Sequence, residues 1–290
     1  MNTIQTITFS RDRPKKYDEK WDADLAGTGK ITGYRTGTDV YIVGRHIYAN
    51  PRSSYMFAAR NGYDLPLWSS LTEINGLELI DTSKVETMRS MFDRSLCGEL
   101  NGLERWDTSS VTDMSAMFYG CTSLLYIYVD DWDVSNVTTF SHMFADCHSL
   151  QIVNFSKWET LSVDSFDALL NDCRSIASID VSGLDTGSCR QFSQMFEGCE
   201  NLEYIYGLES WDVSNASHYA FTETFHRCYM LREINIGNWK APRVDSTARM
   251  FKDCRSLEYI DISGLRGSGD VVDTEMFYGC ERLKEIVRAY

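Results

Sequence analysis

Nine cysteines are the residues best suited to chemistry in this chain of 290 residues, and most of them recur at one regular position. The regular ones are Cys121, Cys147, Cys173, Cys199, Cys228, Cys254 and Cys280. A column of thiols could bind metal, form disulfides or fill a core. Zinc needs four ligands converging in a tetrahedron, and a disulfide needs Cβ atoms that face each other, whereas stacked side chains run parallel. We therefore expect buried, reduced thiols that behave as small core residues.

Other side chains with catalytic potential form no recognised arrangement. The histidines fall in no metal-binding or nucleophile motif; they are His46, His142, His148, His218 and His226. Residues 24–31 resemble a phosphate-binding loop but lack its first glycine and the hydroxyl residue after Lys30. Asp130 and Asp131 lie where nothing would raise a carboxyl pKa. We predict that the protein is not an enzyme and that it needs no cofactor or metal.

The cysteines belong to a repeat with a period of 26 residues. Three residues before each regular cysteine stands a phenylalanine, replaced once by Leu170. Leucine or isoleucine follows three residues after the cysteine, isoleucine or valine three residues later, and tryptophan or leucine beyond that. A unit this small cannot bury its own apolar side chains, so successive units must stack and share a core.

Each unit divides into a strand, a turn and a predicted helix. Ile127 and Val129 alternate with outward residues, which indicates a short strand with both side chains buried. Residues 133–138 can cap a helix, and residues 140–147 carry apolar side chains at helical spacing. We therefore predict an α/β solenoid, a leucine-rich-repeat-like right-handed coil with a parallel concave sheet and short convex helices.

The repeat resembles a known family. Its phrase Trp-Asp-(Thr/Val)-Ser-(Ser/Asn)-Val-Thr, followed by Met-Phe-x-x-Cys-x-x-Leu, is similar to the BspA-like leucine-rich repeat, the 26-residue repeat of bacterial surface proteins. The clearest copies run from Trp106 to Leu124 and from Trp132 to Leu150. The resemblance implies a repeat fold over residues 66–290, and it implies functions such as those of surface adhesins and host-interaction proteins.

Residues 1–55 do not share the period. Their segments 31–35 and 40–43 flank a turn-forming Thr-Gly-Thr-Asp sequence and predict a β-hairpin. We predict that residues 1–55 form a small β-rich N-terminal cap over the first coil, and that residues 56–290 form a solenoid of about eight coils.

The charge of the chain is strongly negative. Its 28 Lys and Arg residues oppose 42 Asp and Glu residues, which gives a formal net charge of −14. Such a surface repels phosphate backbones, so we expect no direct nucleic-acid binding and a protein partner with a basic surface. No apolar stretch is long enough for a transmembrane helix, and the first thirty residues lack the apolar segment of a secretory signal. We expect no membrane association and a cytoplasmic location, with the cell surface as the alternative.

Solenoids usually bind partners on their concave sheet. Tyrosine, acidic and amide residues dominate the outward strand positions there, and tyrosine is common in interfaces because its ring buries a large area at low entropic cost. Exposed tyrosines also suit strands, which is the alternative explanation. Two further alternatives are that a partner contacts the loops at 58–70 and 206–222, or that the protein self-associates through its C-terminal edge. The predicted partner-binding residues are Tyr126, Tyr128, Asp130, Asn154, Asp180, Tyr204, Tyr206, Asn235, Tyr259 and Asp261.

These features predict a non-enzymatic protein–protein interaction module that acts inside a cell by covering a basic partner surface. A phage- or mobile-element-encoded inhibitor of a nucleic-acid-handling machine would fit the charge and the reduced thiols. The alternative, which the resemblance implies, is a bacterial surface adhesin or host-interaction protein of the BspA-like type. A third hypothesis, an enzyme with a site in residues 1–55, has no motif to support it.

Overall fold

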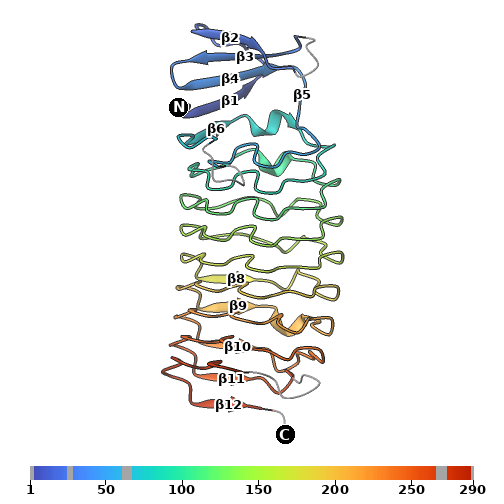
Figure 1. The fold of residues 1–290 in the computed structure, drawn as a ribbon, viewed down its shortest axis with the longest axis vertical. Coiled ribbons are helices and arrows are strands. Elements are labelled where there is room, and N and C mark those ends of the chain that lie inside the picture. Colours follow the sequence, from blue (N-terminus) through green and yellow to red (C-terminus); the bar gives the residue numbers. More distant parts are fainter. Residues whose placement is uncertain (1–2, 25–28, 61–66, 266–272, 289–290) are drawn as a thin grey trace.

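The computed structural model describes residues 3–24, 29–60, 67–265 and 273–288. Figure 1 shows an elongated molecule, in which a small sheet lies at the N-terminal end and the rest of the chain forms a column of stacked coils. Three segments from the sequence analysis lie partly outside the described residues: the phosphate-loop-like segment, the loop at 58–70 and the C-terminal edge.

The N-terminal sheet has five strands in the order β2-β3-β4-β1-β6. Their bounds are β1 (Thr6–Ser10), β2 (Glu19–Asp22), β3 (Ile31–Thr36), β4 (Asp39–Gly44) and β6 (Glu73–Asn75). Strands β3 and β4 pair antiparallel, which confirms the predicted hairpin. Gly37 in its turn has a φ of 59°, a left-handed conformation that glycine adopts readily. Strand β1 pairs in parallel with both β4 and β6, so this sheet continues into the first coil.

The remaining strands are short and pair in parallel with their equivalents one coil away. These strands are β5 (Ile47–Tyr48), β7 (Ile80–Asp81), β8 (Ser178–Asp180), β9 (Tyr204–Tyr206), β10 (Glu233–Asn235), β11 (Tyr259–Asp261) and β12 (Glu285–Val287). Ile179 faces Ile205 and Ile234 faces Ile260, so equivalent repeat positions are in register. A parallel bridge joins Tyr126 to Ile152 in the coils before β8. The predicted parallel arrangement is confirmed.

The repeated side chains form continuous columns inside the stack. The ring centroids of Phe118 and Phe144 are 5.3 Å apart with planes at 5°, and those of Phe225 and Phe251 are 5.2 Å apart at the same angle. A second column consists of tryptophans, whose indole N–H donates to a carbonyl of the preceding coil. In Trp132 this bond reaches the Leu103 carbonyl at 2.8 Å. The columns give the small repeats one shared core, as the period predicts.

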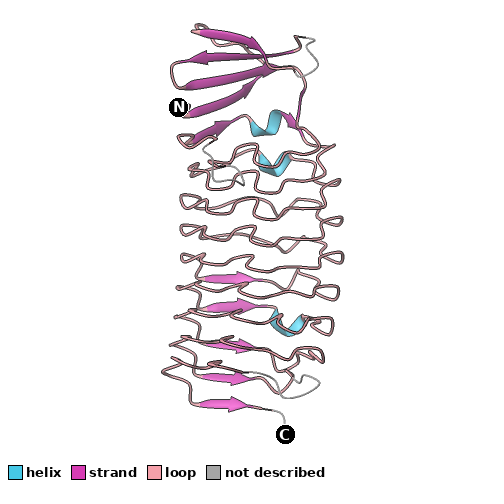
Figure 2. Ribbon diagram, viewed as in Figure 1, coloured by secondary structure: helices cyan, strands magenta, loops and turns pink. Residues whose placement is uncertain are grey.

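The predicted convex helices are wrong. Helical structure in the described residues is limited to three short 3-10 segments (Figure 2), which are η1 (Leu77–Leu79), η2 (Leu103–Arg105) and η3 (Leu208–Ser210). The expected helix cap at Asp133 is a local turn instead. Its carboxylate accepts hydrogen bonds from the backbone N–H of Ser135 at 3.0 Å and from the Ser135 hydroxyl at 2.6 Å, and no helix follows.

Residues 140–147 form successive β-turns in place of the helix. His142 and Asp146 have a φ of 59°, the left-handed conformation that no helical residue adopts. The N–H groups of Phe140, His142 and Phe144 donate to carbonyls of the next coil, while those between them close turns within the coil. The same spacing of left-handed residues recurs along the stack at 90/94, 116/120, 168/172, 194/198, 223/227, 249/253 and 275/279.

The distance between coils explains why turns replace helices. Parallel strands lie about 4.8 Å apart, whereas an α-helix with its side chains is about 10 Å wide. The phenylalanine rings on the turn side repeat at 5.2 to 5.7 Å, so the coils are nearly as close there as on the strand side. Stacked helices do not fit that spacing. The nearly equal spacing on both sides leaves little curvature, and the column runs straight in the view of Figure 1.

Candidate functional site

The strand side of the column carries the predicted partner-binding residues. We call this surface the strand face: the outward side chains of β8 to β12 and of their equivalents at 125–130 and 151–156. Strands β8 and β10 alternate exposed, buried and exposed residues, so their first and third side chains point outward. The in-register pairing of Asp180 with Tyr206, and of Asn235 with Asp261, places equivalent side chains in adjacent rows.

All the predicted site residues are accessible on this face, to different degrees. Three are half-buried: Tyr126, Asp130 and Asp261. The others are exposed: Tyr128, Asn154, Asp180, Tyr204, Tyr206, Asn235 and Tyr259. The inward neighbours Ile127, Val129, Ile179 and Ile234 are buried, which fixes the orientation of each segment. Whether these residues bind a partner stays a prediction.

Two tyrosine pairs form the most prominent features of the strand face. The rings of Tyr126 and Tyr128 have centroids 5.6 Å apart, and those of Tyr204 and Tyr206 are 6.3 Å apart with planes at 14°. Each pair comes from one segment, because residues two positions apart lie on the same side of a strand. Their mutual contact holds aromatic surface in a defined orientation before any partner arrives.

Acidic groups accompany the tyrosines. A hydrogen bond to Glu99 raises the pKa of the Tyr126 hydroxyl. The Asp180 carboxylate accepts hydrogen bonds from Ser182, including one from its backbone N–H at 2.9 Å, and these lower the pKa of Asp180. Asp261 has the same arrangement with Ser263. These two aspartates are therefore charged at neutral pH and give the face a negative potential.

Sequence reasoning missed two apolar residues on the strand face. Leu125 was given no position there, and Ile152 was not assigned to partner binding, yet their exposed fractions are 42% and 66%. A signal for Leu125 exists in the sequence. Leu124 and Leu125 are adjacent, and only one of two consecutive strand residues can point into the core.

The cysteine column lies in the core and not at a reactive site. All nine thiols are free; eight are buried and Cys280 is half-buried, so the expected core role is confirmed. Each thiol of the regular column donates to a phenylalanine or leucine carbonyl one coil earlier, as Cys147 does to Phe118 at 3.1 Å. Burial raises the pKa of these thiols, to about 11 for Cys280. The described residues contain no group of three or more His, Cys, Asp or Glu side chains placed to hold a metal ion.

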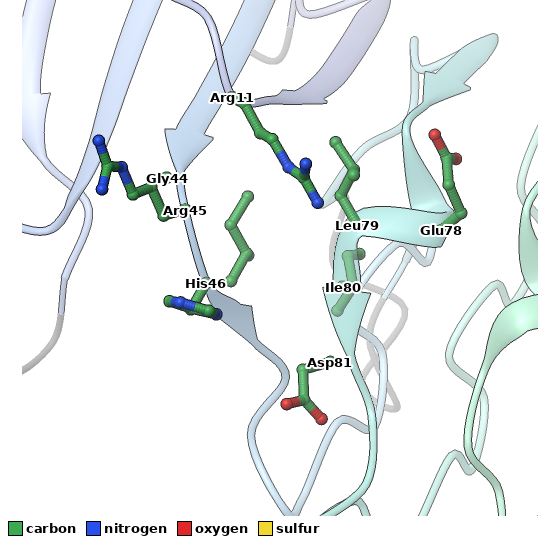
Figure 3. A pocket seen from close by; sticks show the side chains of 9 residues that line it. Arg11, Gly44, Arg45, His46, Glu78, Leu79, Ile80 and Asp81 are labelled. Atoms are coloured by element: carbon green, nitrogen blue, oxygen red, sulfur yellow. The ribbon is translucent and has the colours of Figure 1, made fainter.

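A cavity of about 210 Å³ lies where the N-terminal sheet meets the first coil (Figure 3). Its charged and titratable lining consists of Arg11, Arg45, His46, Glu78 and Asp81. In Figure 3 the Arg11 side chain extends into the gap toward Leu79, and Arg45 points away from it. Asp81 is engaged by Ser83, whose backbone N–H and hydroxyl lie 3.0 and 2.7 Å from its carboxylate and lower its pKa. The lining of this cavity therefore mixes basic and acidic groups and does not select one ligand charge.

The fold and the repeated columns define a leucine-rich-repeat-like protein. The family described as "Mycoplasma protein of unknown function, DUF285" matches residues 54–178, 95–204 and 165–290, and the chain belongs to this family. The resemblance to the BspA-like repeat is confirmed. No curated protein matches the chain.

Solved structures of bacterial leucine-rich repeat proteins match over most of this chain. A leucine-rich repeat protein from Bacteroides ovatus is 19% identical, with a TM-score of 0.40 over 88% of this chain and 67% of its own. A leucine rich cell surface protein from Faecalibacterium prausnitzii is 13% identical, with a TM-score of 0.30 and 96% coverage of both chains. A leucine-rich repeat protein from Eubacterium ventriosum is 12% identical, with a TM-score of 0.34 over 93% of this chain and 84% of its own. None of these comparisons indicates a catalytic family. No helix in the described part of the chain is long and apolar enough to cross a membrane.

Proposed function

We propose that this protein is a partner-binding repeat module, and that its strand face takes up a protein with a basic surface. The observation that carries the proposal is the combination of ordered, accessible tyrosine pairs with charged aspartates on one continuous face. Tyrosines supply interface area, and acidic groups select partners of opposite charge and speed their encounter.

The distribution of charge on the strand face supports a basic partner. The acidic side chains on the strand face or directly beside it in the chain and in the N-terminal coils include Glu73, Glu99, Asp130, Asp180, Glu203, Glu233, Glu258, Asp261 and Glu285. The basic side chains Arg232 and Lys284 are already paired with Glu203 at 3.3 Å and with Glu258 at 2.7 Å. Asp130 lies 3.4 Å from Lys157. Carboxylates such as Asp180, Glu233 and Asp261 have no cation partner among these contacts, and lysine- or arginine-rich surfaces would satisfy them.

The resemblance to BspA-like proteins favours a role at the cell surface over the intracellular inhibitor. Adhesins and host-interaction proteins occur in that family, and nothing in the structure or the comparisons points to a phage-encoded inhibitor. We also propose that residues 1–55 act as a cap, since strand β1 pairs with β6 and thereby covers the first edge of the repeat.

A paired variant tests the strand face. Tyr204→Ala with Tyr206→Ala removes one aromatic pair, and Tyr278→Ala on the turn side removes a more exposed tyrosine as the control. Each protein carries a photo-crosslinking residue at position 235. It is incubated in one experiment with surface proteins of the source organism's host, and in a second experiment with an extract of the source organism's own cells. We expect the wild type and the control to give the same crosslinked bands, and the double variant to lose them. Equal crosslinking by all three, at equal thermal stability, would contradict the proposal.

A further inference from the structure

Exposed apolar side chains of two neighbouring coils adjoin on the strand face. Leu125, Tyr126 and Tyr128 come from one coil and Ile152 from the next, and Tyr126 is bridged directly to Ile152. Tyr128 and Ile152 have exposed fractions of 60% and 66%. Elsewhere on this face the described coils carry exposed apolar residues from only one segment at a time. We call these four residues the two-coil patch.

An acidic cleft adjoins the two-coil patch. It has a volume of about 310 Å³, and its charged lining consists of Asp130, Asp131, Asp133, Lys157 and Glu159. Asp130 lines the cleft and stands two residues after Tyr128 in the chain, so the cleft begins next to the patch. Lys157 pairs with Asp131 and lies 3.4 Å from Asp130. One ammonium therefore opposes four carboxylates, and the cleft keeps an excess of negative charge.

We infer that the two-coil patch and this cleft form one docking site for a partner segment in which apolar side chains are followed directly by lysine or arginine. This inference rests on the proposed function and names the part of the strand face that contributes most to binding. The apolar side chains cover Tyr128 and Ile152, and the cation enters the cleft beside Asp131 and Glu159. Exposed apolar surface of this kind marks interaction sites, and the unbalanced carboxylates select the cation.

Synthetic peptides supply the probe. One fluorescein-labelled peptide carries Leu-Phe followed by Arg-Arg between Gly-Ser flanks, a second replaces Leu-Phe with Ser-Ser, and a third replaces Arg-Arg with Gln-Gln. Fluorescence anisotropy measures the affinity of each for the full chain. We expect the first peptide to bind at least tenfold more tightly than either of the others.

Matched variants locate the binding. Tyr128→Ala with Ile152→Ser should weaken the first peptide at least tenfold, and Asp131→Asn with Glu159→Gln should weaken it several-fold and reduce its salt dependence. The control, Tyr278→Ala, removes a side chain of similar exposure from the turn side of the coil and should change affinity less than twofold.

The outcomes separate this inference from the proposed function. One result is that the first peptide loses binding in the Tyr204→Ala, Tyr206→Ala variant but keeps it in the Tyr128→Ala, Ile152→Ser variant. That result overturns the two-coil patch and leaves the strand face as the binding surface. Insensitivity of the first peptide to every strand-face variant overturns both. Failure of the first peptide to bind, or equal binding of the first and second peptides, also overturns the inference.

Discussion

Replacing Phe144 tests whether the stacked column carries the stability of the repeat. Its ring is fully buried, lies parallel to Phe118 at 5.3 Å and contacts Phe155 at 6.4 Å. Truncating a buried phenylalanine to alanine costs about 3–5 kcal/mol. The lost ring contacts, each worth about 0.5–1.5 kcal/mol beyond burial, place Phe144→Ala in the upper half of that range. The cavity also weakens both interfaces of its coil, because each repeat is stabilised by its neighbours.

The column itself supplies the matched control. Leu170 occupies the same position one coil further on and is also buried. Phe144→Leu therefore introduces a residue that this environment accommodates, at an expected cost of about 1–1.5 kcal/mol. Urea unfolding followed by tryptophan fluorescence gives both free energies of unfolding by linear extrapolation. If the alanine and leucine variants differ by less than about 1 kcal/mol, the ring column does not stabilise the stack as argued.

Three further predictions concern hydrogen bonds, thiols and pH. Trp132→Phe should lower the free energy of unfolding by about 1 kcal/mol in urea titrations. The Leu103 carbonyl loses the indole donor of Trp132 but keeps the hydrogen bond from the Trp106 N–H at 3.0 Å. A cost near zero would show that the indole hydrogen bond contributes nothing. Because burial raises the thiol pKa values and thiolate is the reactive form, a disulfide reagent at neutral pH should modify Cys280 first and the other thiols only on unfolding; rapid modification of all nine would contradict the buried column. Hydrogen bonds from Ser135 lower the folded-state pKa of Asp133 below its unfolded value. The contribution of Asp133 to stability is therefore present above about pH 4 and is lost as the pH falls through the folded pKa. Ser135→Ala should flatten the acid limb of a plot of Tm against pH, and an unchanged slope would refute this.

The columns could be predicted from the sequence because a shared core imposes the same residue type on every coil. Phe118 and Phe144 stand one period apart and stack face to face, and the Trp132 position follows the same rule. The turn side could not be predicted. Apolar residues at 140, 143, 144 and 147 fit a helical face equally well, and the first left-handed position of each coil is occupied by residues such as Ala116 and Arg249 that give no signal for that conformation. The second position is glycine or aspartate in most coils, and these residues do favour that conformation.

The candidate site could be predicted in outline. Period-two alternation identifies which side chains leave the core, and Tyr204 and Tyr206 lie on the face that it indicates. It does not reveal which outward residues of different coils adjoin. The contact between Tyr126 and Ile152 depends on the register between coils, and the cleft depends on how Lys157 lies across Asp130 and Asp131. Register and side-chain direction come from packing, which no local pattern contains.

The geometry of the column limits how the strand face can contact a partner. A curved leucine-rich repeat owes its curvature to helices that are wider than strands, and its concave sheet can surround a globular domain. Here β-turns keep the coils nearly as close on the turn side, where the rings of Phe118 and Phe144 are 5.3 Å apart, as on the strand side, where parallel strands lie about 4.8 Å apart. A compact partner then meets a straight face over a few coils only, unless the partner is itself extended. Binding energy must accordingly concentrate in a small group of adjacent side chains, and the exposed residues that join two coils, Tyr128 and Ile152, are placed to form such a group.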